Sequence, residues 1–573
     1  MNKEIYESLK QVDFQDAESY VINSIRGANL QNEELLCHVV AISALALMQK
    51  ETKGQKPLVD FLDDYINDET TQIFMKKIAK KFPNLIEELS KKFSEDVLKA
   101  TVLFTEPRLF SEVSENSTPT GIARLAIKLL ELNENDVVLD LGSGVNSFLT
   151  EAALEADCKN LNGVEINTNN VIIANIRGFV SELSIKVIQG NIVSQDFAHL
   201  GSNKVFSNYP LGMRLPQLKD YMNKNNSLKK YFKNAKRTVS ADWIFTMAAY
   251  LNMKKPGKTI VLMSNSGTWN KPDEELRRKL IEDGIIEGVI LLPPRLFSFT
   301  SISLTMMILS QNNEKVRMVD ASKIYTEGRR QNSLEMKDIE LIIDAYNNDS
   351  DISKKVSAED ISKQEYILNP QRYIDFESEI DNGISLGEIS LSINRGAMLG
   401  SGELDAMMSK EETNYHYLML QNINEGVIDS KLPSLINIDN KYKKYCIKDR
   451  NLIISKLFPY KVALAHVKED EYILATGNLY FIELDENKVN PLFVEAFLQS
   501  EAGIAQLNRY AKGNVMKSIS VQDLKKIQIP NLPREKQDQI AEEYKNLNDE
   551  LIVLQEQIEM VRDKKAKLIE EVI

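Results

Sequence analysis

The spacing of hydrophobic positions changes along this chain, and each change predicts a different kind of structure. In residues 1–105 apolar side chains recur at helical spacing, most clearly in Glu33–Lys50 and Thr71–Leu98. From Glu112 to about Tyr346, short apolar runs typical of buried strands alternate with helical segments, which predicts a mostly parallel sheet. The expected strands are Val137–Asp140, Leu161–Glu165, Ile185–Gln189, Lys204–Ser207, Thr259–Ser264, Ile285–Leu292 and Ser303–Ser310.

The last third of the chain follows another pattern. Beyond Ser385, short apolar segments are separated by turn residues, which predicts short strands in an α+β domain. The chain then ends on apolar positions whose steps alternate between four and three, as in a long helix that packs against another helix. At 1.5 Å per residue this helix is expected to span roughly 50 Å. Its seam consists of Ile540, Tyr544, Leu547, Leu551, Leu554, Ile558, Val561, Leu568 and Val572.

These patterns together predict a multidomain α/β protein, since 573 residues are too many for one core. The expected domains are a helical domain over 1–110, a parallel-sheet domain over 111–375, an α+β domain over 376–535 and a coiled-coil helix over 536–573. Residues 347–384 read as a charged connector, with Tyr366–Tyr373 closing the second domain. Within that domain, a threonine-capped helix is expected over Gly121–Leu132.

Composition narrows the class of protein. With 43% hydrophobic and 27% charged residues, the chain is typical of a soluble globular protein. Three distant cysteines and four scattered histidines show no metal-ligand spacing and no disulfide framework, which favours a reducing cytoplasm. The polar start of the chain predicts no signal peptide.

Two further features bear on membranes and nucleic acids. The longest apolar run, Leu35–Met48, is interrupted by His38 and is shorter than the ~20 residues of a spanning helix. It predicts a buried core helix and no membrane association. The net charge of −13 means that any nucleic-acid binding must use local basic patches.

One turn has the residue pattern of a ligand-binding site. The apolar strand Val137–Leu139 ends at Asp140, and Gly142 and Gly144 follow in a tight turn before an apolar helix. A second acidic residue, Glu165, ends the next expected strand, where a carboxylate can accept from ribose hydroxyls. The Asp-x-Gly-x-Gly spacing resembles the S-adenosylmethionine loop of class I methyltransferases, with Asn146 where a dinucleotide fingerprint has its third glycine. An ordinary glycine-containing turn would look the same.

A second block follows the fourth expected strand. Asn208-Tyr209-Pro210-Leu211 resembles the Asn-Pro-Pro-aromatic motif of amino-methyltransferases that act on adenine. The wider segment, roughly 1–375, is similar to the modification subunit of type I restriction–modification systems. Blocks in the same order as in that family are Ser117-Thr118-Pro119, Asn146–Leu149, Asp242–Phe245, Leu292–Phe297 and Gly328–Asn332.

The resemblance implies a function and a set of roles. It implies a Rossmann-like, S-adenosylmethionine-dependent domain that methylates the exocyclic nitrogen (N6) of adenine in DNA, with the base flipped out of the duplex. Orientation would do most of the work: the side-chain oxygen of Asn208 and the carbonyl of Tyr209 would accept the amino hydrogens. The cofactor would lie against Thr118, Pro119, Asp140, Gly142, Gly144, Asn146, Glu165 and Asn191.

The motif also departs from the family pattern. Tyr209 replaces the first proline, and Leu211 replaces the aromatic residue that stacks on the flipped base. Such stacking contributes about 1–3 kcal/mol per base, so the ring of Tyr209 or of Phe232 would have to supply it. Asn191 stands where the family often has aspartate, although its amide oxygen can still accept. Two hypotheses therefore stay open: an active adenine methyltransferase, and a silent DNA-recognition subunit with the same fold.

Candidate DNA contacts fall in three basic stretches, each of which can also be an ordinary solvated surface. One lies just after the catalytic block, one in the distal block before Asn332, and one is a basic–aromatic segment beyond residue 440. Because phosphate contacts dominate affinity for DNA, these residues are predicted to bind the duplex. They are Lys229, Lys230, Lys233, Lys236, Arg237, Arg329, Arg330, Lys441, Lys443 and Lys444.

Residues 385–573 are similar to one target-recognition domain of a type I specificity subunit, through segments such as Ile527–Pro530 and Pro533–Ile540. One copy is present, whereas a full specificity subunit has two. The resemblance therefore implies a modification subunit fused to half a specificity subunit. The partners expected are double-stranded DNA, a second copy or another specificity or modification chain along the terminal helix, and a separate restriction nuclease.

Overall fold

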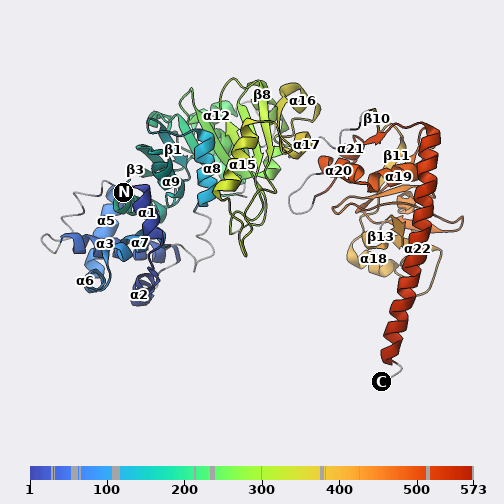
Figure 1. Cartoon of the computed structure of the whole chain (residues 1–573), viewed down its shortest axis with the longest axis horizontal. Helices are drawn as coiled ribbons and strands as arrows, with labels where there is room; N and C mark the ends of the chain where they lie inside the picture. Colours follow the sequence, from blue (N-terminus) through green and yellow to red (C-terminus); the bar gives the residue numbers. More distant parts are fainter. Residues whose placement is uncertain are drawn as a thin grey trace. The chain divides into compact units, whose positions relative to one another are not determined.

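The computed structural model describes residues 1–26, 30, 32–52, 62, 66, 68–105, 117–211, 215–232, 239–298, 300–374, 380, 382–424, 426–511 and 517–570. The chain forms two compact units, Met1–Ile374 and Asp375–Ile573. Figure 1 shows the first unit in blue to yellow and the second in orange to red.

The first unit begins with helices that pack around one apolar helix, α3, which contacts α5, α6, α7 and α10. Pro83 occupies the first turn of α6, where its missing N–H costs no hydrogen bond. Ile172, Ile173 and Ile176 of α10 complete the core of these helices, so the helices and the sheet that follows share buried residues. The bounds are α1 Lys3–Lys10, α2 Gln15–Ile25, α3 Asn32–Thr52, α5 Glu69–Lys81, α6 Pro83–Lys92 and α7 Glu95–Phe104.

Helix α3 is the one described helix long and apolar enough to cross a membrane. Its apolar window, within Glu34–Thr52, is 72% buried inside the unit. Ala41, Ala44 and Leu45 are fully covered by its neighbours. This burial is what the core helix of a folded domain requires.

A nine-stranded sheet forms the centre of the first unit, in the order β3-β2-β1-β4-β5-β7-β6-β8-β9. The strands β3, β2, β1, β4 and β5 run parallel, whereas β7 is antiparallel to both of its neighbours. The bounds are β1 Val137–Leu141, β2 Asn160–Glu165, β3 Ile185–Gln189, β4 Lys204–Ser207, β5 Lys258–Ser264, β6 Ile286–Leu291, β7 Leu304–Leu309, β8 Lys315–Asp320 and β9 Ser353–Ser357.

Helices cover both faces of this sheet, as the strand alternation predicts. Val138 of β1 joins the core under α8, α9 and α15, whereas Leu139 joins the core under α13 and α14 on the other face. Successive side chains of a strand point to opposite faces, so a parallel sheet buried on both sides needs such continuous apolar runs. The helices are α8 Thr120–Leu130, α9 Ser147–Ala156, α10 Thr168–Ser181, α11 Leu215–Met222, α12 Asn226–Tyr231, α13 Ala241–Leu251, α14 Glu274–Glu282, α15 Met336–Asn347, α16 Ala358–Lys363 and α17 Gln371–Ile374.

Two local predictions are wrong. Helix α8 has Pro119 at its N-cap with no side-chain cap, so no threonine caps it, and Thr120 is already helical. The expected connector over 347–384 contains β9, α16 and α17, and β9 pairs with β8 at the edge of the sheet. Lys354 and Lys355 lie within β9. Charged residues on an edge strand weaken the apolar signal of a strand and prevent further pairing.

The second unit contains small sheets packed against helices. Its largest sheet has four strands in the order β11-β19-β16-β17, and a second has three in the order β12-β18-β15. The bounds are β10 Gly383–Ser385, β11 Ser390–Arg395, α18 Ser401–Met407, β12 Tyr415–Leu418, β13 Ile423–Asn424, β14 Val427–Ile428, β15 Cys446–Ile447, β16 Leu452–Ser455, β17 Val462–Leu464, β18 Tyr472–Ala475, β19 Leu479–Leu484, α19 Pro491–Gln499, α20 Glu501–Tyr510, α21 Val521–Leu524, β20 Gln528–Pro530 and α22 Arg534–Glu570.

The long terminal helix α22 packs at its start and then leaves the body of its unit (Figure 1). Near its start, Asp538 accepts a 2.7 Å hydrogen bond from Asn490, and Tyr544 donates to Glu495 of α19. Further along the predicted seam, Leu547 and Val561 are 65% and 64% exposed. Leu568 of the seam has no described side chain, and Val572 lies outside the described residues.

Candidate active site

The turn between β1 and α9 brings three backbone conformations that ordinary residues avoid. The φ angles of Gly142, Gly144 and Asn146 are +87°, +53° and +72°. Asparagine tolerates this left-handed region better than most residues, so Asn146 substitutes for the glycine of a dinucleotide fingerprint. The turn is fixed to the neighbouring strand because the Gly142 N–H donates to the Val164 carbonyl at 2.8 Å. The loop is thus anchored to β2 at the carboxyl end of β1.

Glu165 closes this loop from the end of β2. Its two carboxylate oxygens accept from the backbone N–H groups of Gly144 at 2.9 Å and Asn167 at 2.8 Å. The carboxylate is buried beside β1, since β1 and β2 are parallel neighbours. Glu165 therefore shapes the loop as well as offering its remaining lone pairs to a ligand.

Buried polar atoms without partners gather around the same loop. Asp140 is almost fully buried, and burial together with the nearby Glu165 raises the pKa of its carboxyl well above its usual range. Within the described chain, four buried atoms lack a hydrogen-bond partner here: Asp140 Oδ1, Ser143 Oγ, Asn146 Oδ1 and Asn170 Nδ2. Buried polar groups are nearly always satisfied. A polar ligand bound here would supply the hydrogen-bond partners that these four atoms lack.

Asn208 lies on the next strand end, directly beside the loop. Asp140 of β1 pairs with Phe206 of β4, which puts Asn208 past the carboxyl end of β4. A Cβ added to Gly142 would lie 3.7 Å from the Asn208 carbonyl oxygen. The Asn208 side-chain Nδ2 donates to the Thr118 hydroxyl at 3.2 Å. With its nitrogen engaged, the amide presents Oδ1 as an acceptor.

Tyr209 points into the core, so of the two rings considered for stacking on a flipped base, that of Tyr209 is buried. The ring is 2% exposed and lies on Phe245 of α13 at a centroid distance of 4.5 Å. Its hydroxyl donates to Asp242 at 2.8 Å, and burial with Asp242 beside it raises the pKa of Tyr209 well above its usual range. The ring therefore anchors the turn, leaving only the Tyr209 backbone for contact with a substrate.

The other candidate rings and side chains of this block differ in exposure. Pro210 is exposed, while Leu211 is half-buried and packs against the cores on both faces of the sheet. Phe232 is also half-buried and packs edge-to-face on Tyr231 at 5.4 Å. Asn191 follows β3, and its Oδ1 accepts from the Val193 and Ser194 N–H groups at 3.0 and 3.1 Å. The Asn191 Oδ1 atom, which was expected to accept from the cofactor, is thus already hydrogen-bonded within its own turn.

The distal sequence blocks meet each other in space. The Arg295 guanidinium donates to the carbonyl oxygens of Gly328 and Arg329 at 3.3 and 3.2 Å, and Asn332 Nδ2 donates to the Pro294 carbonyl at 2.9 Å. The same segment reaches α8, because a Cβ on Gly121 would lie 2.4 Å from the Leu334 carbonyl. These contacts fix the loop that carries Arg329 and Arg330, whose side chains are exposed.

The other basic candidates are on surfaces of their own. Lys229 and Lys230 are exposed on α12. Lys233, Lys236 and Arg237 lie outside the described residues. In the second unit, Lys441 pairs with Glu403 at 3.2 Å, while Lys443 and Lys444 are exposed on the same turn.

Sequence reasoning missed several residues that build the site. Ser143 and Asn170 contribute unpartnered polar atoms at the loop, and Ser264 holds Asp242 by donating its hydroxyl. Ser264 had a usable signal, because a polar residue at the carboxyl end of a parallel strand lies at the edge where ligands bind. Asn170 had none, since its position depends on how α10 packs.

Residues 109–382 match the N-6 DNA methylase family. The methylase subunit of the type I restriction enzyme MjaVIII of Methanocaldococcus jannaschii is 27% identical over 306 residues, which cover 48% of this chain and 52% of that relative. The MjaVII methylase subunit of the same organism is 25% identical over 364 residues, covering 58% of this chain and 62% of the relative.

The chain thus spans between half and two thirds of the length of these two relatives. Among solved structures, a type I restriction–modification methyltransferase subunit from Streptococcus thermophilus aligns with a TM-score of 0.46 and 18% identity. That alignment covers 63% of this chain and all of the other. The first unit is a mixed α/β unit whose sheet has parallel strands at its core.

Proposed function

We propose that this chain is a DNA methyltransferase that transfers a methyl group from S-adenosylmethionine to N6 of adenine, as part of a restriction–modification or defence system. The observation that carries the proposal is the meeting of Asn208 with the β1–α9 loop. Thr118 holds the Asn208 amide at 3.2 Å, and the Asn208 backbone borders Gly142. The match of residues 109–382 to the N-6 DNA methylases supports the same chemistry.

The residues of the loop fit the cofactor. S-adenosylmethionine, when bound, supplies a methyl group on a positively charged sulfur. Asp140 would hold this cation close to Asn208, and Glu165 would accept from the ribose hydroxyls with the lone pairs that Gly144 and Asn167 leave open. The unpartnered Ser143, Asn146 and Asn170 atoms would gain partners on a polar ligand. Thr118 and Pro119, at the start of α8, would border the same site.

Asn208 would act by orientation. The exocyclic nitrogen of adenine is a poor nucleophile because its lone pair is delocalised into the ring. Two acceptors that hold its hydrogens favour a tetrahedral nitrogen whose lone pair faces the methyl group. We infer that Asn208 Oδ1 is one acceptor and the Tyr209 carbonyl the other. No general base with an unusual pKa is needed in this scheme.

A second candidate function is a silent DNA-recognition subunit with the methyltransferase fold. The observation that favours it is the absence, among the described residues of the catalytic turn, of an exposed ring: Tyr209 is buried and Leu211 is aliphatic. Without stacking, about 1–3 kcal/mol of support for a flipped base is lost. Among the described residues that follow this turn, Tyr221 is 36% exposed and Phe232 is half-buried.

We further infer the assembly that such an enzyme would need. Residues 376–535 would serve as one target-recognition domain, and the exposed seam of α22 would pair with a second copy or with another specificity or modification chain. A separate restriction subunit would supply any cleavage. We place this assembly in the cytoplasm, where its DNA substrate lies.

The proposal is tested on genomic DNA. Cells with this chain should carry N6-methyladenine at a defined sequence motif, and deletion of the gene should remove it. Complementation with Asn208→Ala should leave the motif unmethylated, whereas complementation with the unchanged chain should restore it. An identical methylation pattern with and without the gene would favour the silent subunit.

A further inference from the structure

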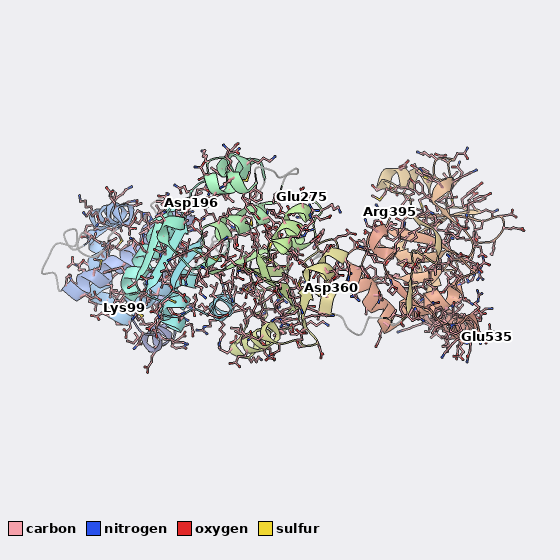
Figure 2. All side chains as sticks on the ribbon, turned by 90° about the horizontal axis from the view of Figure 1, so that it is seen from above. Lys99, Asp196, Glu275, Asp360, Arg395 and Glu535 are labelled. Carbon is pink, nitrogen blue, oxygen red and sulfur yellow. The ribbon has the colours of Figure 1, made fainter. Side chains whose placement is uncertain are left out.

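Two cations converge at one end of the four-stranded sheet of the second unit. Arg395 ends β11 and pairs with Tyr480, while Ser455 ends β16 and pairs with Leu479. Since β11 and β16 lie on either side of β19, their last residues reach the same end of the sheet. Lys456 follows Ser455 directly, so it lies at that end with Arg395, which is labelled in Figure 2.

The backbone and one side chain of this pair are held firmly. Arg395 Nε donates to the Gly477 carbonyl at 2.7 Å, and its Nη2 lies 3.1 Å from the Met398 sulfur. The backbone N–H of Lys456 donates to the Asn478 carbonyl at 2.8 Å, and the Lys456 carbonyl accepts from the Ile519 N–H at 3.0 Å. Arg395 and Lys456 are therefore both hydrogen-bonded to the turn Thr476–Asn478. The Arg395 guanidinium has further N–H groups that can donate to a ligand.

Among the described residues, no carboxylate neutralises the pair. In the parts of the chain that the structure describes, neither Arg395 nor Lys456 forms an ion pair. Burial and the charge of Arg395 lower the pKa of the Lys456 ammonium. Asp523 and Arg395 both influence the pKa of the Tyr480 hydroxyl. The Asp523 carboxylate accepts a 2.7 Å hydrogen bond from the Ser520 hydroxyl. Adjacent like charges are unfavourable, so an anion between them would stabilise the site.

The opposite end of β16 provides the contrast. Lys448 and Arg450 precede β16, as Lys456 follows it, but each has its own acidic partner. Lys448 lies 3.1 Å from Glu483, and Arg450 forms two hydrogen bonds with Glu486 at 2.8 and 3.0 Å. The chain carries a net charge of −13. The unneutralised positive pair at one end of β16 would attract a polyanion, whereas the neutralised pair at the other end would not.

We propose that Arg395 and Lys456 form a binding site for a phosphate of the DNA backbone. The proposal rests on the proposed function as a DNA methyltransferase, and it adds a contact that none of the predicted basic stretches contains. Met398 and Phe458 are exposed beside the pair, and their apolar surfaces suit the sugars that flank a phosphate. Such a contact would position the duplex on the second unit without reading its sequence.

The test uses the full chain with two double variants that change the net charge equally. Arg395→Gln with Lys456→Gln removes the proposed site, and Arg450→Gln with Lys448→Gln removes the neutralised pair. Binding of a 30-base-pair duplex of random sequence is measured at four salt concentrations. The first variant should bind about tenfold more weakly at low salt, and its slope of log K against log salt should shrink by about 1. The second should behave as the unchanged chain.

Further arms separate the alternatives. Lys456→Arg should keep the slope, and thermal melts of all variants should match that of the unchanged chain. An unchanged slope and affinity in the Arg395 and Lys456 variant would overturn the site while the unchanged chain still binds duplex. A loss confined to duplexes with the methylated motif would overturn the phosphate assignment in favour of base contact. Failure of the unchanged chain to bind any duplex would contradict the proposed function itself.

Discussion

At the scale of single residues, Asp140 carries the sharpest prediction about the cofactor. Burial and Glu165 raise the pKa of its carboxyl, so the protonated form persists to higher pH than in an ordinary aspartate. A cationic cofactor favours the ionised form. Binding should therefore release a proton below the raised pKa, and affinity should rise with pH, by at most about tenfold per pH unit.

Calorimetry in two buffers with different ionisation enthalpies measures this proton release. Asp140→Asn provides the control, because it keeps the shape and removes the titrating group. The variant should bind with an affinity that no longer depends on pH in this range. Binding of the cofactor to the unchanged chain with no proton release and no pH dependence would contradict the role given to Asp140.

At the residue level, the sequence predicts which positions lie close together where strand order fixes them, while the roles of these residues stay predictions. Asp140, Gly142, Gly144 and Asn208 follow adjacent parallel strands, so their neighbourhood follows from strand order. The burial of the Tyr209 ring could not be predicted in this way. Its ring is buried by Phe245 and bonded to Asp242, both from α13 more than thirty residues later.

At the scale of elements, the packing of α22 on α19 makes folding of the second unit sensitive to pH. Burial raises the pKa of Glu495 on α19 to about 8, and Tyr544 of α22 donates to it. The folded unit thus keeps a proton that the unfolded chain loses near its usual pKa of 4.5. Stability should fall as pH rises from about 4.5 to about 8, by about 1.4 kcal/mol per pH unit at most.

Hydrogen exchange of α19 and the start of α22 across this range measures the effect. Glu495→Gln removes the titrating group, so protection in the variant should depend less on pH and should exceed that of the unchanged chain at pH 8. Glu501→Gln, an exposed carboxylate at the start of α20, is the matched control and should retain the full dependence. Equal pH dependence in all three proteins would refute the assignment to Glu495.

The elements themselves were well predicted where apolar runs are long. Each of the seven expected strands of the first unit agrees with the structure to within one residue at either end. The strands β8 and β9 were missed because Lys315, Arg317, Lys354 and Lys355 interrupt their apolar positions. A strand near the edge of a sheet is partly solvated, so its sequence resembles that of a loop.

At the scale of the whole molecule, the exposed face of α22 predicts an oligomer. Leu547, Leu554, Ile558 and Val561 are all at least 48% exposed along one seam. Antiparallel pairing of two copies would bury this seam, and two-fold symmetry is the commonest arrangement for such an interface. Light scattering should then give about twice the 65.1 kDa of one chain. The homodimer should read an inverted, two-part DNA site.

Two changes test this assembly. Truncation after Glu543 and the double variant Leu554→Glu with Ile558→Glu should each yield monomers, since both side chains are exposed in the single chain. A control change at Ile504, an exposed apolar residue of α20, should leave the dimer intact. A chain that stays monomeric with and without DNA, and recognises an undivided asymmetric site, would rule out pairing of two copies in favour of a different partner.

The wider organisation was only partly readable from sequence. The change of pattern beyond Ser385 predicts the separate character of the last third, whereas the core that α3 shares with α10 depends on contacts across more than one hundred residues. Periodicity reports which face of an element is buried, but not which partner buries it. The division into four domains and the fusion with a recognition domain remain predictions.

Transfer of a labelled methyl group from S-adenosylmethionine to duplex DNA by the purified chain tests the central claim most directly. The unchanged chain should produce N6-methyladenine, and Asn208→Ala should lose this product while still binding cofactor and DNA, because its part is to orient the amino group. A chain that binds both ligands yet forms no N6-methyladenine, or a variant that methylates as fast as the unchanged chain, would contradict the account.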